Sequence, residues 1–145
     1  MDPTLAAVLG VSMRWIHIVS VVILIGGFIY ARFVMAPALA TLPQPEREVA
    51  GKNSVNSFRP LLLTVLVTAL GSGAYNYATK GAYPPTYHIW MGIKLLLVLH
   101  IYVSAILYSV RESNEVKRNR TALSITIAGL IVIGIADYLR YLSLR

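Results

Sequence analysis

Four long apolar runs with almost no charge restrict what this chain can fold into. A helix rises about 1.5 Å per residue, so roughly 17–25 residues cross the hydrocarbon core of a bilayer. Inside that core, only helices and closed barrels satisfy their own backbone hydrogen bonds. The runs therefore predict an all-α integral membrane protein, a single domain of four transmembrane helices. The expected spans are about residues 9–34, 60–79, 86–110 and 121–140.

The composition agrees with a bilayer environment. Hydrophobic residues make up 57% of the 145 residues and charged residues 13%, whereas soluble domains carry about 25% charged residues. The absence of cysteine excludes disulfides, thiolate metal sites, iron–sulfur clusters and cysteine nucleophiles. The net charge of +7 comes from basic residues at the ends of the runs. Lipid is thus the expected partner, and nucleic acid is not.

Short connections separate the runs, at residues 35–56, 80–85 and 111–120. None of them is long enough for an extramembrane domain. Helices joined in this way run antiparallel, which predicts an up-down-up-down four-helix bundle. Pro60 is expected in the first turn of the second helix, where its missing N–H is harmless.

Basic residues are more numerous beside the first and third connections than on the opposite side. By the positive-inside rule, this asymmetry predicts that both termini lie outside the cytoplasm. The membrane that we expect is a bacterial-type inner membrane. The first group comprises Arg32, Arg47, Lys52, Arg59, Arg111, Lys117, Arg118 and Arg120, and the second comprises Arg14, Lys80, Arg140 and Arg145.

Four ionisable residues stand out at depth within the spans, namely His17, Lys94, His100 and Asp137. Such residues are costly in a bilayer and are functional candidates that face the bundle interior. Counted along each helix, His17 and Lys94 lie at the same depth in the outer half, while His100 lies near the centre. Lys94 and His100 differ by about 120° in direction around their helix, so they cannot face the same point. We therefore expect His17 and Lys94 in one interior cavity.

A haem b is the first cofactor hypothesis, because bundle interiors hold haem through ligands on facing helices. His17 is the expected first axial ligand, with His100 or Lys94 as the second. Arg14 lies one turn before His17, where it either pairs with a haem propionate or anchors the helix at the interface. The alternative for the histidines is a hydrogen bond to Ser or Thr on a neighbouring helix. The alternative for Lys94 is an ion pair with Asp137.

Copper is the second cofactor hypothesis. Met13 and His17 are four residues apart, and His88 and Met91 are three apart, so each pair shares one helix face. Thioether and imidazole groups suit copper. The alternative is that both methionines pack or face lipid and that His88 lies at the interface.

Glycine pairs occur on the first two spans, at Gly26 and Gly27 and at Gly71 and Gly73. Missing side chains let helices approach closely or leave room for a flat ring. The sequence predicts packing or a cavity at these positions.

Three segments of the sequence are similar to a known family. They are WIHIVSVVILIGGFIYARF, with Trp15, His17, Gly26, Gly27, Tyr30 and Arg32; WMGIKLLLVLH, with Trp90 and Lys94; and FRPLLLTVLVTALGSGAYN. These segments resemble the small four-helix membrane proteins related to the copper resistance D (CopD) domain and to HemJ, the membrane protoporphyrinogen oxidase. In HemJ-like proteins a first-helix histidine and a third-helix lysine are tied to haem and activity. The resemblance implies these roles for His17 and Lys94.

These observations lead to one main hypothesis and two alternatives. The main hypothesis is a haem-dependent oxidoreductase or electron-transfer protein that accepts electrons from a quinol or a porphyrin-like donor. The first alternative is a CopD-like copper transport or handling protein. The second is a structural subunit, packed against other membrane subunits or against copies of itself.

Overall fold

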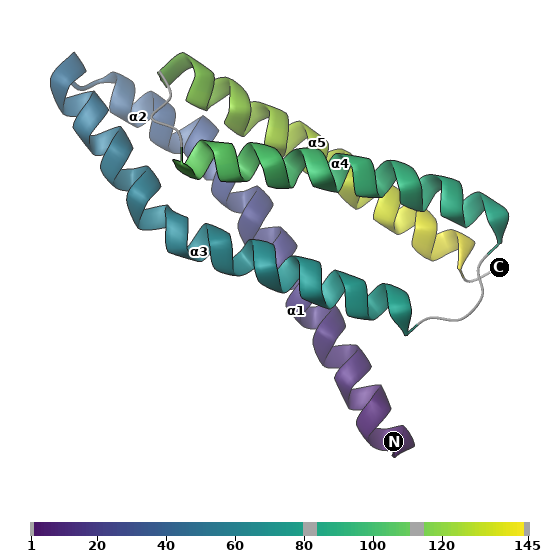
Figure 1. The fold of residues 1–145 in the computed structure, drawn as a ribbon. Helices are drawn as coiled ribbons and strands as arrows, with labels where there is room; N and C mark the ends of the chain where they lie inside the picture. The colour runs from purple at the N-terminus through teal and green to yellow at the C-terminus, as the bar shows by residue number, and fades with distance from the viewer. Residues whose placement is uncertain (1, 80–83, 111–114, 144–145) are drawn as a thin grey trace.

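The computed structural model describes residues 2–79, 84–110 and 115–143, which are almost entirely helical. Four helical rods run antiparallel in one bundle, as Figure 1 shows. All four are long and apolar enough to cross a membrane, which confirms the predicted all-α four-helix fold class. The first rod is α1 (Pro3–Tyr30), a π-helical stretch (Ala31–Met35) and α2 (Ala36–Ala40), and the others are α3 (Gln44–Ala78), α4 (Pro85–Val110) and α5 (Glu115–Leu142).

The first rod begins and ends with local hydrogen bonds. At its start the Asp2 side chain accepts a hydrogen bond from the backbone N–H of Thr4 at 2.9 Å, which caps α1. At its end the Arg47 guanidinium donates to the carbonyls of Ala40 (2.8 Å) and Leu42 (3.0 Å). Arg47 thus stabilises the turn between α2 and α3.

The first connection is much shorter than expected. The prediction of a connection over residues 35–56 is wrong, because helix continues from both sides and only residues 41–43 separate α2 from α3. Pro45 lies in the first turn of α3, where no N–H partner is needed, and Glu46 favours the positive end of that helix. These local signals start α3 well before its apolar run.

Pro60 therefore lies inside α3 rather than in its first turn, which corrects the second expectation for this helix. A proline inside a helix leaves one carbonyl without its usual donor and bends the helix. Figure 1 shows α3 changing direction along its length. The other helix boundaries lie closer to the predicted spans. Three of the basic residues used to predict the orientation, Lys80, Arg111 and Arg145, lie outside the described residues.

The helices pack as two pairs. α1 lies along α3 and α4 lies along α5, while α1 also contacts α5 and α3 contacts α4 much less. The main core joins all four rods: Phe28 of α1, Leu62 of α3 and Ile125 of α5 are fully buried in it, and α4 contributes Ile101 and Ala105. A smaller cluster of Tyr87 and Ile135 with its neighbours joins α4 to α5 near the end of α5.

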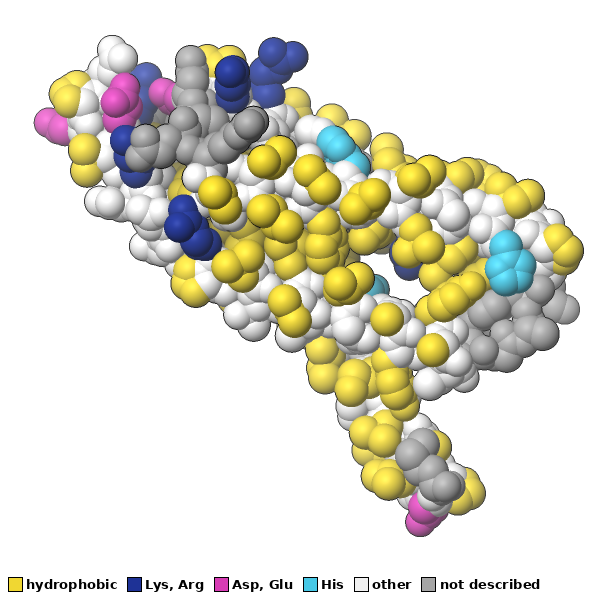
Figure 2. Space-filling model, viewed as in Figure 1, with side chains coloured by type: hydrophobic (Ala, Val, Ile, Leu, Met, Phe, Trp, Pro, Cys, Tyr) yellow, Lys and Arg dark blue, Asp and Glu magenta, His cyan; other side chains and the backbone are white. Residues whose placement is uncertain are grey.

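Most of the apolar surface points outward. Large hydrophobic side chains are exposed along all four rods, and they cover much of the face drawn in Figure 2. A water-soluble monomer rarely exposes apolar surface so extensively. This surface is compatible with a lipid bilayer around the bundle.

Candidate functional site

His17 is half-buried between α1 and α3. Its Nδ1 lies 2.9 Å from the carbonyl oxygen of Ala69 and 3.3 Å from the hydroxyl of Ser72. Because a carbonyl oxygen only accepts, Nδ1 carries the proton and donates to Ala69. Nε2 then holds the free lone pair and makes no hydrogen bond within the described part of the chain. This is the tautomer in which Nε2 can bind a metal.

Gly73 sets the position of the His17 ring. A Cβ atom at Gly73 would lie 2.9 Å from Cε1 and 3.2 Å from Nδ1 of His17, closer than real contacts of this kind. A Cβ atom at Gly71 would meet nothing within 4 Å. The ring therefore lies directly against the α3 backbone, and only one glycine of this pair makes room for it.

His17 belongs to a row of polar contacts between α1 and α3. One turn before it, the Asn76 side-chain amide donates to the Met13 carbonyl at 3.3 Å. About one turn after it, the hydroxyls of Ser20 and Thr68 lie 2.8 Å apart. In an apolar bilayer such hydrogen bonds between helices hold two helices in one register. The row thus fixes the height of His17 against α3.

The bundle also has an opening in its surface. Figure 2 shows it between α3 and α4, with a histidine and a basic side chain at its edge. Lys94 is half-buried on α4, a helix that packs mainly on α5, and lies within electrostatic reach of the His17 imidazole.

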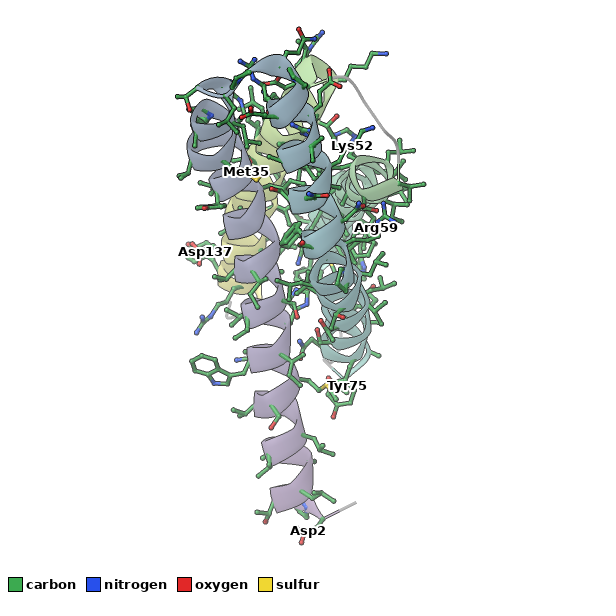
Figure 3. All side chains as sticks on the ribbon, turned by 90° about the vertical axis from the view of Figure 1, so that its left-hand side faces the viewer. Asp2, Met35, Lys52, Arg59, Tyr75 and Asp137 are labelled. Atoms are coloured by element: carbon green, nitrogen blue, oxygen red, sulfur yellow. The ribbon has the colours of Figure 1, made fainter. Side chains whose placement is uncertain are left out.

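His100 does not lie beside His17 in the structure. His100 is exposed on α4, and its Nε2 lies 3.0 Å from the hydroxyl of Ser124 on α5. Figure 2 shows histidine side chains at separate places on the bundle. Arg14 is exposed one turn before His17, and Asp137 is exposed on α5 and points outward in Figure 3.

The proposed copper ligands lie on different surfaces. Met13 is half-buried on the α1 face that meets α3, whereas Met91 packs against the α4–α5 cluster around Tyr87. His88 is exposed, with its ring edge-on to the ring of Tyr87 at 6.2 Å between centroids. Within residues 2–79, 84–110 and 115–143, no group of three His, Asp or Glu side chains is placed to hold a metal ion.

Of the α3 residues that position His17, the sequence analysis named Gly73 but not Ala69 or Ser72. Ala69 contributes only a backbone carbonyl, which no side-chain pattern reveals. The run Gly71–Gly73 does carry a signal, because small residues mark close helix contacts in membranes. Which neighbouring helix they meet depends on the packing of the whole bundle.

Comparison of the chain with protein-family models, with curated proteins and with solved structures found no match.

Proposed function

We propose that this protein is a membrane redox protein that binds haem b, with His17 as an axial ligand through Nε2. The observation that carries the proposal is the hydrogen bond from His17 Nδ1 to the Ala69 carbonyl, which leaves Nε2 as the lone-pair donor. Metal-ligating histidines almost always donate their other ring nitrogen in this way. Gly73 makes room for the His17 ring against α3, and Figure 2 shows an opening between α3 and α4.

Lys94 is the second residue that we assign to this site, as a ligand or as a positive charge beside the group. It is half-buried, and its charge acts on His17. His100 fits less well, because it bonds to Ser124 on α5. Arg14, one turn from His17 and exposed, is placed to pair with a propionate near the membrane surface.

Haem would supply one-electron redox chemistry inside the bilayer. The chain's own contribution is to orient the His17 imidazole, to fix its tautomer and to surround the site with apolar helices. A quinol or a porphyrin-like donor dissolved in the membrane would reach such a site through the bilayer. We therefore propose electron transfer from a donor of this kind.

The absorption spectrum of the protein purified in detergent tests the proposal. We expect a Soret band either as isolated or after adding haem, at about one haem per chain, with reduced-minus-oxidised difference bands. A spectrum without a Soret band, unchanged by added haem, would contradict it. Metal analysis of the same sample should show iron, and stoichiometric copper without haem would instead support the copper hypothesis.

We also propose that the bundle lies in a bacterial-type inner membrane with both termini outside the cytoplasm. Basic and acidic side chains gather at the end of the bundle where α2 meets α3, as Figure 2 shows. The opposite end carries fewer basic residues in the sequence. Positively charged ends stay in the cytoplasm during insertion, which gives this orientation.

A further inference from the structure

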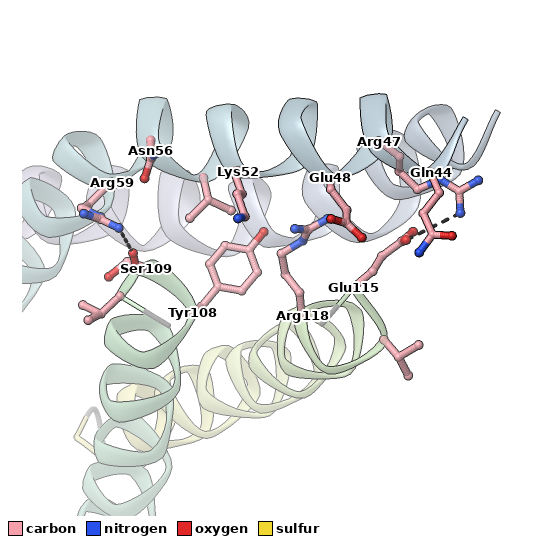
Figure 4. A pocket seen from close by; sticks show the side chains of 13 residues that line it. Gln44, Arg47, Glu48, Lys52, Asn56, Arg59, Tyr108, Ser109, Glu115 and Arg118 are labelled. Atoms are coloured by element: carbon pink, nitrogen blue, oxygen red, sulfur yellow. Dashed lines mark hydrogen bonds and ion pairs between the residues drawn. The ribbon is translucent and has the colours of Figure 1, made fainter. Parts of the chain in front are cut away.

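A charged pocket lies at the other end of the bundle from His17. It has a volume of about 760 Å³ and lies between the first half of α3, the end of α4 and the start of α5 (Figure 4). Four basic and two acidic side chains line it, which leaves an excess of positive charge. The four basic residues are among those whose charges predicted the orientation of the chain. They lie close together because α3 begins earlier than the sequence predicted.

Two of the basic side chains, Arg47 and Arg59, already bind groups within the protein. Arg47 donates to the carbonyls that end α2 and lies 3.6 Å from the Glu115 carboxylate. Arg59 donates to the carbonyl of Ser109 and thereby joins α3 to the end of α4. Its Nε is buried and has no hydrogen-bond partner among the described residues. These two arginines thus connect the helices that surround the pocket.

Two other donors are directed into the pocket and have no hydrogen-bond partner among the described residues. The Arg118 guanidinium lies over Gly51, where an added Cβ atom would come within 2.7 Å of it. It makes no hydrogen bond or ion pair with any described residue. Tyr108 is 5% exposed, and Figure 4 shows its hydroxyl group in the pocket, where it donates to no described acceptor. Phe28 holds the tyrosine ring edge-on at 5.2 Å.

These donors suit one chemical group in particular. Arg118 comes from α5, Tyr108 from α4 and Arg59 from α3, so the donors approach the pocket from three helices. A carboxylate has two oxygens in one plane and is satisfied by a single guanidinium, whereas a phosphate offers several oxygens in a tetrahedral arrangement. We propose that this pocket binds a phosphate group, with Arg118 and Tyr108 as its main donors. The proposal does not depend on haem binding at His17.

The pocket lies at the edge of the apolar region. Arg59 directly precedes the apolar run of α3, and Val110 ends α4. Lipid phosphates lie at this depth, and a soluble phosphate compound also reaches it from the water side. Both sources offer the same chemistry, so the experiment uses one ligand of each kind.

Native mass spectrometry of the detergent-solubilised full chain counts bound ligands directly. One sample is titrated with inorganic pyrophosphate and the other with phosphatidylglycerol, with phosphatidylcholine as a lipid of no net charge. We expect one saturable site for at least one of the two anionic ligands. Binding of phosphatidylglycerol alone assigns the site to a lipid headgroup, and binding of pyrophosphate assigns it to a soluble phosphate compound.

Arg118→Gln should weaken this binding about tenfold or more, because it removes a charge-assisted contact. Arg120→Gln is the matched control, since Arg120 is exposed two residues along the same helix and does not line the pocket. We expect it to change affinity less than about twofold. Tyr108→Phe keeps the ring packed on Phe28 and should weaken binding several-fold. Equal losses for Arg118→Gln and Arg120→Gln, or no saturable site for either ligand, would overturn the proposal.

Discussion

At the scale of single residues, the contact between His17 and α3 depends on the missing side chain of Gly73. Gly73→Ala places a methyl group 2.9 Å from Cε1 of His17, so the ring must shift and its hydrogen bond to Ala69 must lengthen. We expect the variant to retain haem poorly, measured as Soret absorbance per protein after purification.

Gly71→Ala is the control for this substitution, because the same methyl group meets nothing within 4 Å there. Both variants gain the same helix propensity, so the difference between them isolates the contact with His17. Equal Soret absorbance in the two variants would contradict the account of the ring position.

The sequence predicted some of these residues and not others. The depth of His17 and Lys94 follows from counting residues along apolar spans, and Lys94 lies within electrostatic reach of His17 in the structure. For His100 the alternative of a hydrogen bond to Ser or Thr on a neighbouring helix is confirmed, with Ser124 as the partner. Which helix supplies that partner did not follow, because a wheel of one helix does not say which neighbour covers each face. The pocket at Arg118 and Tyr108 was missed, since its α3 side lies where a connection was expected.

At the scale of helices, the missing side chain of Gly27 on α1 makes room for the Phe58 ring of α3. A Cβ atom at Gly27 would lie 2.7 Å from the Phe58 ring, which itself packs edge-on to Phe28. Gly27→Ala should therefore lower the free energy of unfolding by about 1–3 kcal/mol through overpacking. Reversible unfolding in mixed micelles with increasing dodecyl sulfate measures this change.

Gly26→Ala serves as the comparison in that experiment, because Gly26 is exposed and an added Cβ meets nothing within 4 Å. It should be neutral or slightly stabilising. A loss of the same size in both variants would mean that helix packing at Gly27 is not the cause.

A side-chain hydrogen bond from Tyr102 joins α4 to α3 beside the main core. The Tyr102 hydroxyl donates to the carbonyl of Leu66 at 2.5 Å. Tyr102→Phe removes this bond and keeps the ring, so we expect a loss of about 1 kcal/mol in the same unfolding experiment. Tyr138→Phe, at an exposed ring on α5, should change the unfolding free energy far less. If the two substitutions cost the same, the bond to Leu66 contributes nothing.

The number and order of the helices were predictable because bilayer thickness sets the length of each apolar run. The boundaries of α3 were not, because its first turns are polar and carry no hydropathy signal. Those turns are helical since Pro45 and Glu46 favour a helix start and Arg47 closes the preceding turn. Local capping chemistry, rather than hydropathy, determined this part of the fold.

At the scale of the whole molecule, the two ends of the bundle differ in charge, and the proposed orientation follows from that difference. The chain has no cysteine, so single introduced cysteines report accessibility without background. Ser143→Cys, near the end of α5, should react with a membrane-impermeant maleimide in intact cells. Asn53→Cys, exposed on α3, should react only after the membrane is opened. The reverse pattern would contradict the orientation.

The most direct test of the central claim compares the Soret absorbance of wild-type protein with that of His17→Ala, purified in parallel. His88→Ala is the control, because it removes an exposed histidine on another helix. We predict equal absorbance per protein for wild type and His88→Ala and no Soret band for His17→Ala, while its helical circular dichroism stays unchanged. A His17→Ala protein that keeps the wild-type Soret band would show that His17 is not the haem ligand.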